Sequence, residues 1–318
     1  MRGQGVPPIL VTGSHRSGTT WVGALLASSG ETHNIHEPFN PGLYRAWCRV
    51  PMPAWFMHID AHNSDIFEAD AEAIVALRPP AAAMWRRAEG VRQKARVAID
   101  VAEAARARHS GKRPLVKDPI ALLSAEWLNR EFGVRPVVLI RHPAAFLSSV
   151  LRLGWRFDFS NLSRQEHLLD DLLEPFATEI EAAVSADMDL LDNGILQWRV
   201  FNHVVAEYRR RHPDWLVLRY EDLAADPVDR ARRLYDSLGL AWSVEAARAV
   251  SDLSASHNVA EVDSSDKGGV RRDSSEAMWT WLSRLSIAQV SEIRARTADV
   301  AEAFYGTADW HRAGNGSP

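Results

Sequence analysis

Short apolar runs alternate with segments of helical periodicity along this chain. Residues 9–12 form an apolar run between Pro8 and Gly13, which predicts a buried strand. The apolar spacing of residues 19–28 predicts a helix, and Ser29-Gly30 supplies its end. Further strands are predicted at 114–117, 136–140 and 216–219, with helices at 121–132, 143–153, 196–211 and 227–238. This alternation predicts an α/β fold whose parallel sheet is covered by helices on both faces.

The remaining segments have less regular patterns. We expect one domain over residues 1–318, with helical insertions at about 43–110 and 155–195. Residues 81–109 predict one long basic helix, whereas 168–191 are acidic and helical with an interruption at Pro175. The polar segment 252–273 predicts a loop, and residues 306–318 a frayed tail.

Composition narrows the class of protein. Hydrophobic residues make up 46% and charged residues 25% of the 318 positions, as in ordinary globular proteins. The formal net charge of −4 argues against a global electrostatic grip on nucleic acid. Cys48 is the only cysteine, which excludes an intramolecular disulfide and a thiolate metal cluster. No transmembrane segment and no signal peptide are recognised, so we expect a cytoplasmic protein.

A glycine-containing loop lies between the first predicted strand and helix. Gly13-Ser14-His15-Arg16-Ser17-Gly18-Thr19-Thr20 places backbone N–H groups and the positive end of a helix around an anion. A Walker A loop has Lys after its second glycine, but this chain has Thr19, with Arg16 three positions earlier. The strand at 136–140 ends in Arg141 rather than in a magnesium-binding carboxylate, and Glu221-Asp222 is the only rival. The loop therefore predicts a phosphate-type ligand without indicating a metal-dependent NTPase.

Two motifs together resemble a known family. Residues Arg16-Ser17-Gly18-Thr19-Thr20-Trp21 resemble the 5′-phosphosulfate loop of sulfotransferases that use 3′-phosphoadenosine-5′-phosphosulfate (PAPS). Arg141 with Ser149 eight positions later resembles the 3′-phosphate motif of the same family. Tyr220-Glu221-Asp222 follows a predicted strand, as in the family, where the Tyr contacts adenine. The resemblance covers about residues 9–240 and implies a P-loop-type sheet.

The resemblance also implies catalytic residues. Lys117-Asp118-Pro119 is similar to the tyrosylprotein branch, in which this Lys helps to bind the sulfonyl group. Cytosolic members have a catalytic His where this chain has Pro119, so the base must come from elsewhere. In the tyrosylprotein branch a Glu about a score of residues after the loop Arg is the base, and Glu37 stands 21 positions after Arg16. A surface-loop acid is the alternative for Glu37, and His36 is the reserve base.

The implied reaction is in-line sulfuryl transfer from PAPS to a hydroxyl or amine, with adenosine 3′,5′-bisphosphate as product. Arg16 and Lys117 would neutralise developing charge, and residues 17–20 would hold the 5′-phosphate. Trp21 would stack on adenine or serve as a core residue. Lys267 and Arg271 loosely match the C-terminal cofactor loop. No metal is required, although the twelve histidines can form a site that only the fold assembles.

The acceptor is indicated by two aromatic clusters that follow the implied catalytic elements. Either they wall an acceptor pocket or they pack irregular segments; they are Tyr44, Trp47, Trp55, Phe56 and Met57, and Trp155, Phe157 and Phe159. The acidic residues 170, 171, 174, 179 and 181 indicate a solvated helix face or, at a cleft, a site that disfavours polyanions. We expect a small-molecule, glycoside or glycolipid acceptor and a bacterial enzyme. The alternatives are a P-loop small-molecule kinase and a non-catalytic nucleotide-binding module.

Overall fold

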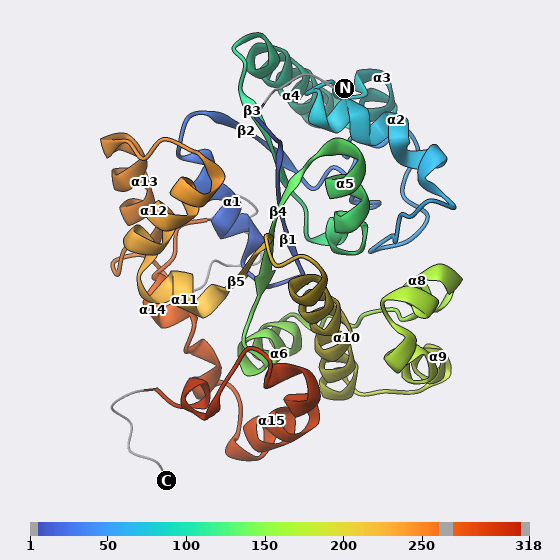
Figure 1. Cartoon of the computed structure of the whole chain (residues 1–318), viewed down its shortest axis with the longest axis vertical. Coiled ribbons are helices and arrows are strands. Elements are labelled where there is room, and N and C mark those ends of the chain that lie inside the picture. Colours follow the sequence, from blue (N-terminus) through green and yellow to red (C-terminus); the bar gives the residue numbers. More distant parts are fainter. Residues whose placement is uncertain (1–5, 261–269, 313–318) are drawn as a thin grey trace.

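The computed structural model describes residues 6–260 and 270–312. Its five-stranded sheet is parallel throughout, in the order β2-β3-β1-β4-β5. The strands are β1 (Ile9–Gly13), β2 (Thr32–His36), β3 (Arg113–Lys117), β4 (Arg135–Ile140) and β5 (Leu216–Arg219). Figure 1 shows the sheet nearly edge-on, with helices on both sides. The predicted α/β fold, with a P-loop-type parallel sheet covered on both faces, is confirmed.

Strand register places the chemistry-bearing segments at one edge of the sheet. β1 lies in the centre, where Val11 pairs with Lys117 of β3 and Gly13 pairs with Leu139 of β4. On the outer side of β3, His36 of β2 pairs with Lys117. Because all the strands run in the same direction, their carboxyl ends meet at the same edge, where ligands bind in open parallel sheets.

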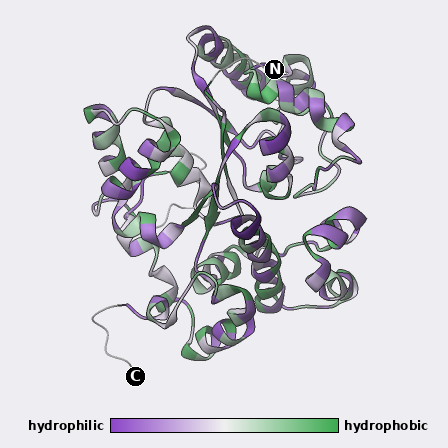
Figure 2. Ribbon diagram, viewed as in Figure 1, coloured by the Kyte–Doolittle hydropathy of each residue, from purple (hydrophilic) through white to green (hydrophobic). Residues whose placement is uncertain are grey.

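The two faces of the sheet bury separate hydrophobic clusters. Ile9 and Val11 of β1 pack on one face with α1 (Thr19–Ala27), α12 (Pro227–Leu238) and α13 (Val244–Ser254). Leu10 points to the other face, which is covered by α5 (Ala125–Phe132), α6 (Pro143–Leu153), α10 (Leu190–Arg211) and α15 (Ile287–Ala301). Figure 2 shows hydrophilic and hydrophobic residues along the surrounding helices, as one buried and one solvated side require.

The other helices complete the two layers. They are α2 (Ser64–Val75), α3 (Ala81–Arg87), α4 (Gly90–His109), η1 (Pro119–Ser124), α5 (Ala125–Phe132), α6 (Pro143–Leu153), α7 (Ser160–Ser163), α8 (Glu166–Asp171), η2 (Glu174–Phe176), α9 (Ala177–Ser185), α10 (Leu190–Arg211), α11 (Tyr220–Ala225), α14 (Ser274–Ala277), η3 (Thr280–Ser283), α15 (Ile287–Ala301) and η4 (Thr307–Trp310). No helix in the described ranges is long and apolar enough to cross a membrane.

Several predicted boundaries are confirmed, and one strand was missed. The side chain of Asp226 accepts a hydrogen bond from the Asp229 backbone N–H at the start of α12, which ends at Gly239 with φ +67°. Strand β2 was not predicted, because its sequence, Thr-His-Asn-Ile-His, has only two buried positions. As an edge strand it lacks the continuous apolar run that identifies central strands.

Two of the expectations for the less regular segments are wrong. Residues 81–109 form two helices, because Ala88 and Glu89 are extended and Gly90 has φ +64°. By contrast, the acidic segment 168–191 is helical with an interruption at Pro175, as expected: η2 contains Pro175 and separates α8 from α9, and the Asp189 side chain then caps the first turn of α10. The expected frayed tail includes η4, and Trp310 is buried with its ring 4.3 Å from that of His142.

Candidate active site

The loop between β1 and α1 has the backbone shape of an anion-binding turn. The Ser17 hydroxyl and backbone N–H both donate to the Ser14 carbonyl, at 2.7 and 3.3 Å. Gly18 has φ +99° and precedes α1 without a side-chain cap. A Cβ at Gly18 would lie 2.5 Å from Cδ2 of Tyr220, so both the backbone conformation and the space require glycine. The first N–H groups of α1 therefore face the loop without competition from a capping side chain.

The two predicted phosphate motifs are in direct contact. Arg16 Nε donates to Ser149 Oγ at 2.8 Å, and Arg141 Nη1 donates to the Arg16 carbonyl at 3.0 Å. Arg141 is buried, and its Nη2 donates to the Ala277 carbonyl at 3.3 Å. Arg141 comes from the end of β4 and Ser149 from α6, so the parallel sheet brings both to the loop after β1.

The Tyr220 ring packs against Arg141, and Trp21 packs against Tyr220. The Arg141 guanidinium is 4.9 Å from the centroid of the Tyr220 ring, a cation–π arrangement. Trp21 packs edge-on against Tyr220, with ring centroids 5.5 Å apart, and neither side chain is exposed. The burial of Trp21 agrees with the core-residue alternative.

Lys117 and Glu37 meet at the ends of neighbouring strands. Lys117 ends β3 and Glu37 follows β2, and Lys117 Nζ lies 2.6 Å from Glu37 Oε1. The Lys117 side chain is 1% exposed and runs beside α1, where a Cβ on Gly23 would approach Lys117 Cγ to 2.8 Å. Gly23 is thus required for this path, a role that sequence reasoning missed.

The Glu37 segment is held in an unusual conformation. Glu37 has φ +48°, and Arg16 has φ +64°, both in the left-handed region that non-glycine residues seldom adopt. The Glu37 N–H donates to the Lys117 carbonyl at 2.8 Å, and Asn40 Nδ2 donates to Glu37 Oε2 at 2.7 Å. These contacts fix the carboxylate in place. Asn40 is a second site residue that was missed, because an amide in a loop carries no spacing signal.

Asp118 fastens the same segment from β3. Its two carboxylate oxygens accept hydrogen bonds from the backbone N–H groups of Phe39 and Ile120, at 2.8 and 2.9 Å. Burial raises the pKa of Asp118 to about 7, and the nearby Glu37 charge acts in the same direction. Asp118 therefore positions the Glu37 segment against the end of β3.

Electrostatics separate the two candidate bases. Burial alone would raise the pKa of Glu37, but the charge of Lys117, that of His36 and hydrogen bonds from Lys117 and Asn40 outweigh it and lower the pKa to about 2. Burial and the Lys117 charge lower the pKa of His36 to about 4. At neutral pH Glu37 is therefore ionised and His36 is neutral. His36 Nε2 lies 3.8 Å from Glu37 Oε1.

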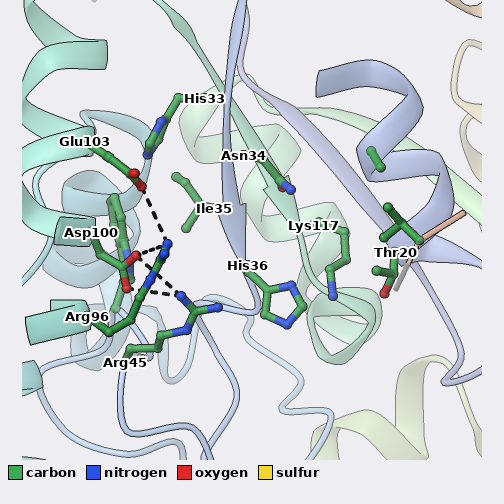
Figure 3. Close-up of a pocket in the computed structure, with 13 residues that line it drawn as sticks. Thr20, His33, Asn34, Ile35, His36, Arg45, Arg96, Asp100, Glu103 and Lys117 are labelled. Carbon is green, nitrogen blue, oxygen red and sulfur yellow. Dashed lines mark hydrogen bonds and ion pairs between the residues drawn. The ribbon is translucent and has the colours of Figure 1, made fainter. Parts of the chain in front are cut away.

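A cavity of about 280 Å³ opens beside Lys117 (Figure 3). Thr20, His36 and Lys117 line one end of it. At the other end Asp100 lies between two arginines, 3.2 Å from Arg45 Nη1 and 2.6 Å from Arg96 Nη2.

The two predicted aromatic clusters meet at His15. Its ring lies edge-on to Trp55, Phe56 and Trp155, with centroids 5.8, 4.8 and 6.2 Å away. Trp55 and Trp155 are exposed, whereas Phe56 is buried. Burial lowers the pKa of His15 to about 4, so its ring is neutral at pH 7. Trp47 and Phe159 are buried core residues, and Tyr44, Met57 and Phe157 pack against the same core.

The remaining predicted residues lie away from these contacts. Lys267 is outside the described residues, and Arg271, near the start of the described range 270–312, is exposed. Glu221, the rival magnesium ligand, is engaged: its oxygens accept hydrogen bonds from the His142 backbone N–H and the Tyr305 hydroxyl, at 2.9 and 3.1 Å. The five acidic residues between 170 and 181 are exposed, which agrees with a solvated surface.

Comparison with known proteins places the chain in a family. No curated protein matches it significantly. Similar solved structures include the sulfotransferase domain from the Synechococcus PCC 7002 olefin synthase (19% identity, 96% of this chain and 98% of that chain, TM-score 0.47). The sulfotransferase domain from the curacin biosynthetic pathway is 13% identical (93% and 99% covered, TM-score 0.48). Sulfotransferase STF9 from Mycobacterium avium is 16% identical (94% and 77% covered, TM-score 0.44).

The family model decides the assignment. The model of the Sulfotransferase family matches residues 7–244, well over half of the chain. The matched range includes Arg16, Glu37, Lys117, Arg141 and Tyr220. The chain therefore belongs to the Sulfotransferase family and is a sulfotransferase enzyme.

Proposed function

We propose that this sulfotransferase transfers the sulfuryl group of PAPS to a hydroxyl or amine of a small-molecule, glycoside or glycolipid acceptor. The observation that carries the proposal is the convergence of the Arg16 loop with Arg141 and Ser149 on one side, and of Lys117 with Glu37 on the adjoining strand ends. The 5′-phosphate then has the loop N–H groups as partners and the 3′-phosphate has Arg141 and Ser149, while the base lies beside the cation assigned to the sulfonyl group.

The residues present fit such a donor. Arg141 Nε, Tyr220 Oη and Trp21 Nε1 are buried and have no hydrogen-bond partner within the described part of the chain. Buried polar groups that lack partners are costly, so a ligand that accepts from Arg141 and bonds the Tyr220 hydroxyl would relieve them. The uncapped start of α1 supplies backbone N–H groups for the 5′-phosphate. Arg141, with Ser149, would hold the 3′-phosphate.

Some residues of the chain would stabilise negative charge during the reaction, and another would accept the proton of the acceptor. PAPS supplies the sulfuryl group, and adenosine 3′,5′-bisphosphate leaves as the acceptor oxygen bonds to sulfur. Arg16 and Lys117 neutralise charge on the bridging and sulfonyl oxygens. Glu37 accepts the proton of the acceptor hydroxyl, and Asn40 keeps the carboxylate oriented. Lys117 has three donors, so it can contact a sulfonyl oxygen and Glu37 together.

Two features support an acceptor site beside Glu37. The cavity at Lys117 and His36 gives a polar space whose arginines and acids balance in charge. His15, Trp55 and Trp155 offer an aromatic surface next to the phosphate loop. A polar cavity and an aromatic wall together suit a hydroxylated or glycosidic molecule better than a polyanion.

Ligand binding and transfer test the proposal. We expect adenosine 3′,5′-bisphosphate, without metal, to raise the melting temperature more than ATP with magnesium does. Labelled PAPS and an acceptor panel of phenols, glycosides and glycolipids should then yield a sulfated product. Stabilisation by magnesium-ATP alone would favour the kinase alternative, which the engaged Glu221 already disfavours. Tight binding of the bisphosphate with no turnover would favour the non-catalytic nucleotide-binding module.

A further inference from the structure

Outside the residues assigned to catalysis, three metal-ligating side chains come together from distant parts of the chain. Asp60 and His62 belong to the loop before α2, and His167 lies on α8. One potential ligand atom from each lies within 4.8 Å of those of the other two. No motif spacing indicates this group, because more than 100 positions separate His62 from His167.

The charges around the group favour a cation. Asp60, His62 and His167 line a cavity of about 390 Å³ between the loop and α8. Four carboxylates border this cavity, and Arg130 is the only guanidinium among its lining residues. The carboxylates are those of Asp60, Glu126, Asp170 and Asp171. Glu126 and Asp171 are ion-paired with Arg211, at 3.6 and 3.0 Å. Of the other two carboxylates, that of Asp60 has an oxygen within 4.8 Å of ligand atoms of both imidazoles.

We propose that Asp60, His62 and His167 bind a divalent transition-metal ion, with Zn²⁺ as the best match. Two imidazole nitrogens and one carboxylate oxygen form a donor set that zinc accepts, with water in the remaining position. Ligand atoms around tetrahedral zinc lie about 3.3 Å apart, given bonds of about 2.0–2.2 Å. The ligand atoms, which all lie within 4.8 Å of one another, therefore need to approach by at most about 1.5 Å.

The present positions of the rings allow that contraction. The two imidazoles stack face to face, with centroids 4.0 Å apart and planes 11° apart. A ligating nitrogen directs its lone pair in the plane of its ring, so one imidazole must turn out of the stack to share an ion. The His62 side chain is 66% exposed and has room to turn. Its Nδ1 lies 3.2 Å from Asp60 Oδ2, which is already close to the spacing of two ligand atoms on one zinc ion.

The ion would hold the loop before α2, residues 55–62, against the α7–α8 segment, and this loop reaches the proposed catalytic region. Three hydrogen bonds already join this loop to the α7–α8 segment: Trp55 N–H to Asn161 Oδ1, His58 N–H to Gln165 Oε1, and Gln165 Nε2 to the Phe56 carbonyl, at 2.9, 2.8 and 3.1 Å. Trp55 and Phe56 in turn contact His15 of the phosphate loop. A shared metal between Asp60, His62 and His167 is thus a structural clamp on the loop that carries these aromatic side chains.

Metal titration of the tag-free full chain, stripped with chelator, tests the clamp. We expect one Zn²⁺ per chain, a rise in melting temperature on zinc addition, and visible d–d absorption when Co²⁺ is used instead. His167→Ala and His62→Ala should each weaken Zn²⁺ binding by at least about 10- to 100-fold. His109→Ala is the matched control, since His109 is exposed at the end of α4 and should bind zinc as the wild type does.

The outcomes separate clearly. His62 is exposed, so its alanine variant keeps the test valid even where His167→Ala fails to fold. Absence of saturable one-to-one binding would overturn the proposal. So would equal affinity in the wild type and both site variants, or an equal loss in His109→Ala. None of these readouts depends on sulfuryl transfer, so failure of the proposed function leaves this test intact.

Discussion

The ammonium of Lys117 lies 2.6 Å from a carboxylate oxygen of Glu37, although 80 positions separate the two residues in the sequence. Parallel pairing of β2 with β3 brings them together, since His36 and Lys117 are register partners and Glu37 comes next. The cation proposed for the sulfonyl group is thus neutralised by the proposed base before any ligand binds. We expect donor binding to draw Lys117 toward the sulfonyl oxygens and thereby to make Glu37 more basic.

The same pair predicts a pH dependence of stability. The pKa of Glu37 is lowered from 4.5 to about 2 in the folded protein, so the folded state favours the ionised carboxylate. That contribution is complete above about pH 4.5 and is lost as the pH falls toward 2. It corresponds to roughly 3 kcal/mol at neutral pH.

Urea unfolding between pH 2 and 7 measures this contribution. The free energy of unfolding of the wild type should fall more steeply below pH 4.5 than that of Glu37→Gln. Lys112→Met, which changes an exposed lysine, should follow the wild type. Parallel curves for wild type and Glu37→Gln would contradict the depressed pKa.

Arg141 should determine recognition of the 3′-phosphate. Arg141→Ala removes a charge-assisted contact and should weaken the binding of adenosine 3′,5′-bisphosphate by roughly 1.5–3 kcal/mol. The binding of adenosine 5′-monophosphate should weaken much less. Calorimetric titration of both ligands measures the difference. Arg135→Ala is the control, because Arg135 is exposed at the opposite end of β4. Equal weakening of the two ligands would make Arg141 a support of the Arg16 carbonyl and nothing more.

Gly18 should tolerate no side chain. Gly18→Ala combines a left-handed backbone, φ +99°, with a Cβ 2.5 Å from the Tyr220 ring. Gly133→Ala is the matched control, with φ +62° and nothing within 4 Å of its Cβ. The control should lower the free energy of unfolding by about 1 kcal/mol through backbone strain alone. Gly18→Ala should lower it by more, and it should also weaken the binding of adenosine 3′,5′-bisphosphate. Chemical denaturation and calorimetry measure the two effects, and equal costs for both variants would refute the steric argument.

Sequence alone predicts the parts of this protein that depend on local pattern. The central strands are continuous apolar runs, and the ends of α6 and α12 carry Gly154 and Gly239 with positive φ. The polar edge strand β2 has no such pattern, and neither does the break at Ala88 and Glu89, because tertiary packing decides both.

The candidate site also contains residues that sequence motifs predict and residues that only the folded structure reveals. Motif spacing and the family resemblance predicted Arg16, Arg141 and Lys117 as site residues, and the fold brings these three residues to one edge of the sheet. Asn40, Asp118 and Gly23 act through contacts that only the folded chain creates: a hydrogen bond to Glu37, two bonds to backbone N–H groups, and the space for Lys117. No spacing rule identifies residues of this kind.

Replacement of Glu37 tests the proposed base most directly. Pro119 occupies the position where cytosolic sulfotransferases are expected to have a histidine, and it lies at the start of η1 with no proton to exchange. Glu37→Gln keeps the shape of the side chain and its contact with Asn40, but it removes the basicity. Turnover should therefore fall by about two to four orders of magnitude, the usual contribution of general base catalysis.

Single-turnover transfer and calorimetric binding of adenosine 3′,5′-bisphosphate measure the two sides of this prediction. Binding should change little, because Glu37 is assigned to the acceptor and not to the donor. His36→Asn is the companion variant, since His36 is neutral at pH 7 and lies 3.8 Å from Glu37. Near-normal transfer by Glu37→Gln together with a large loss in His36→Asn would move the role of base to His36. A loss of bisphosphate binding in Glu37→Gln would instead show that the ion pair with Lys117 supports the phosphate loop.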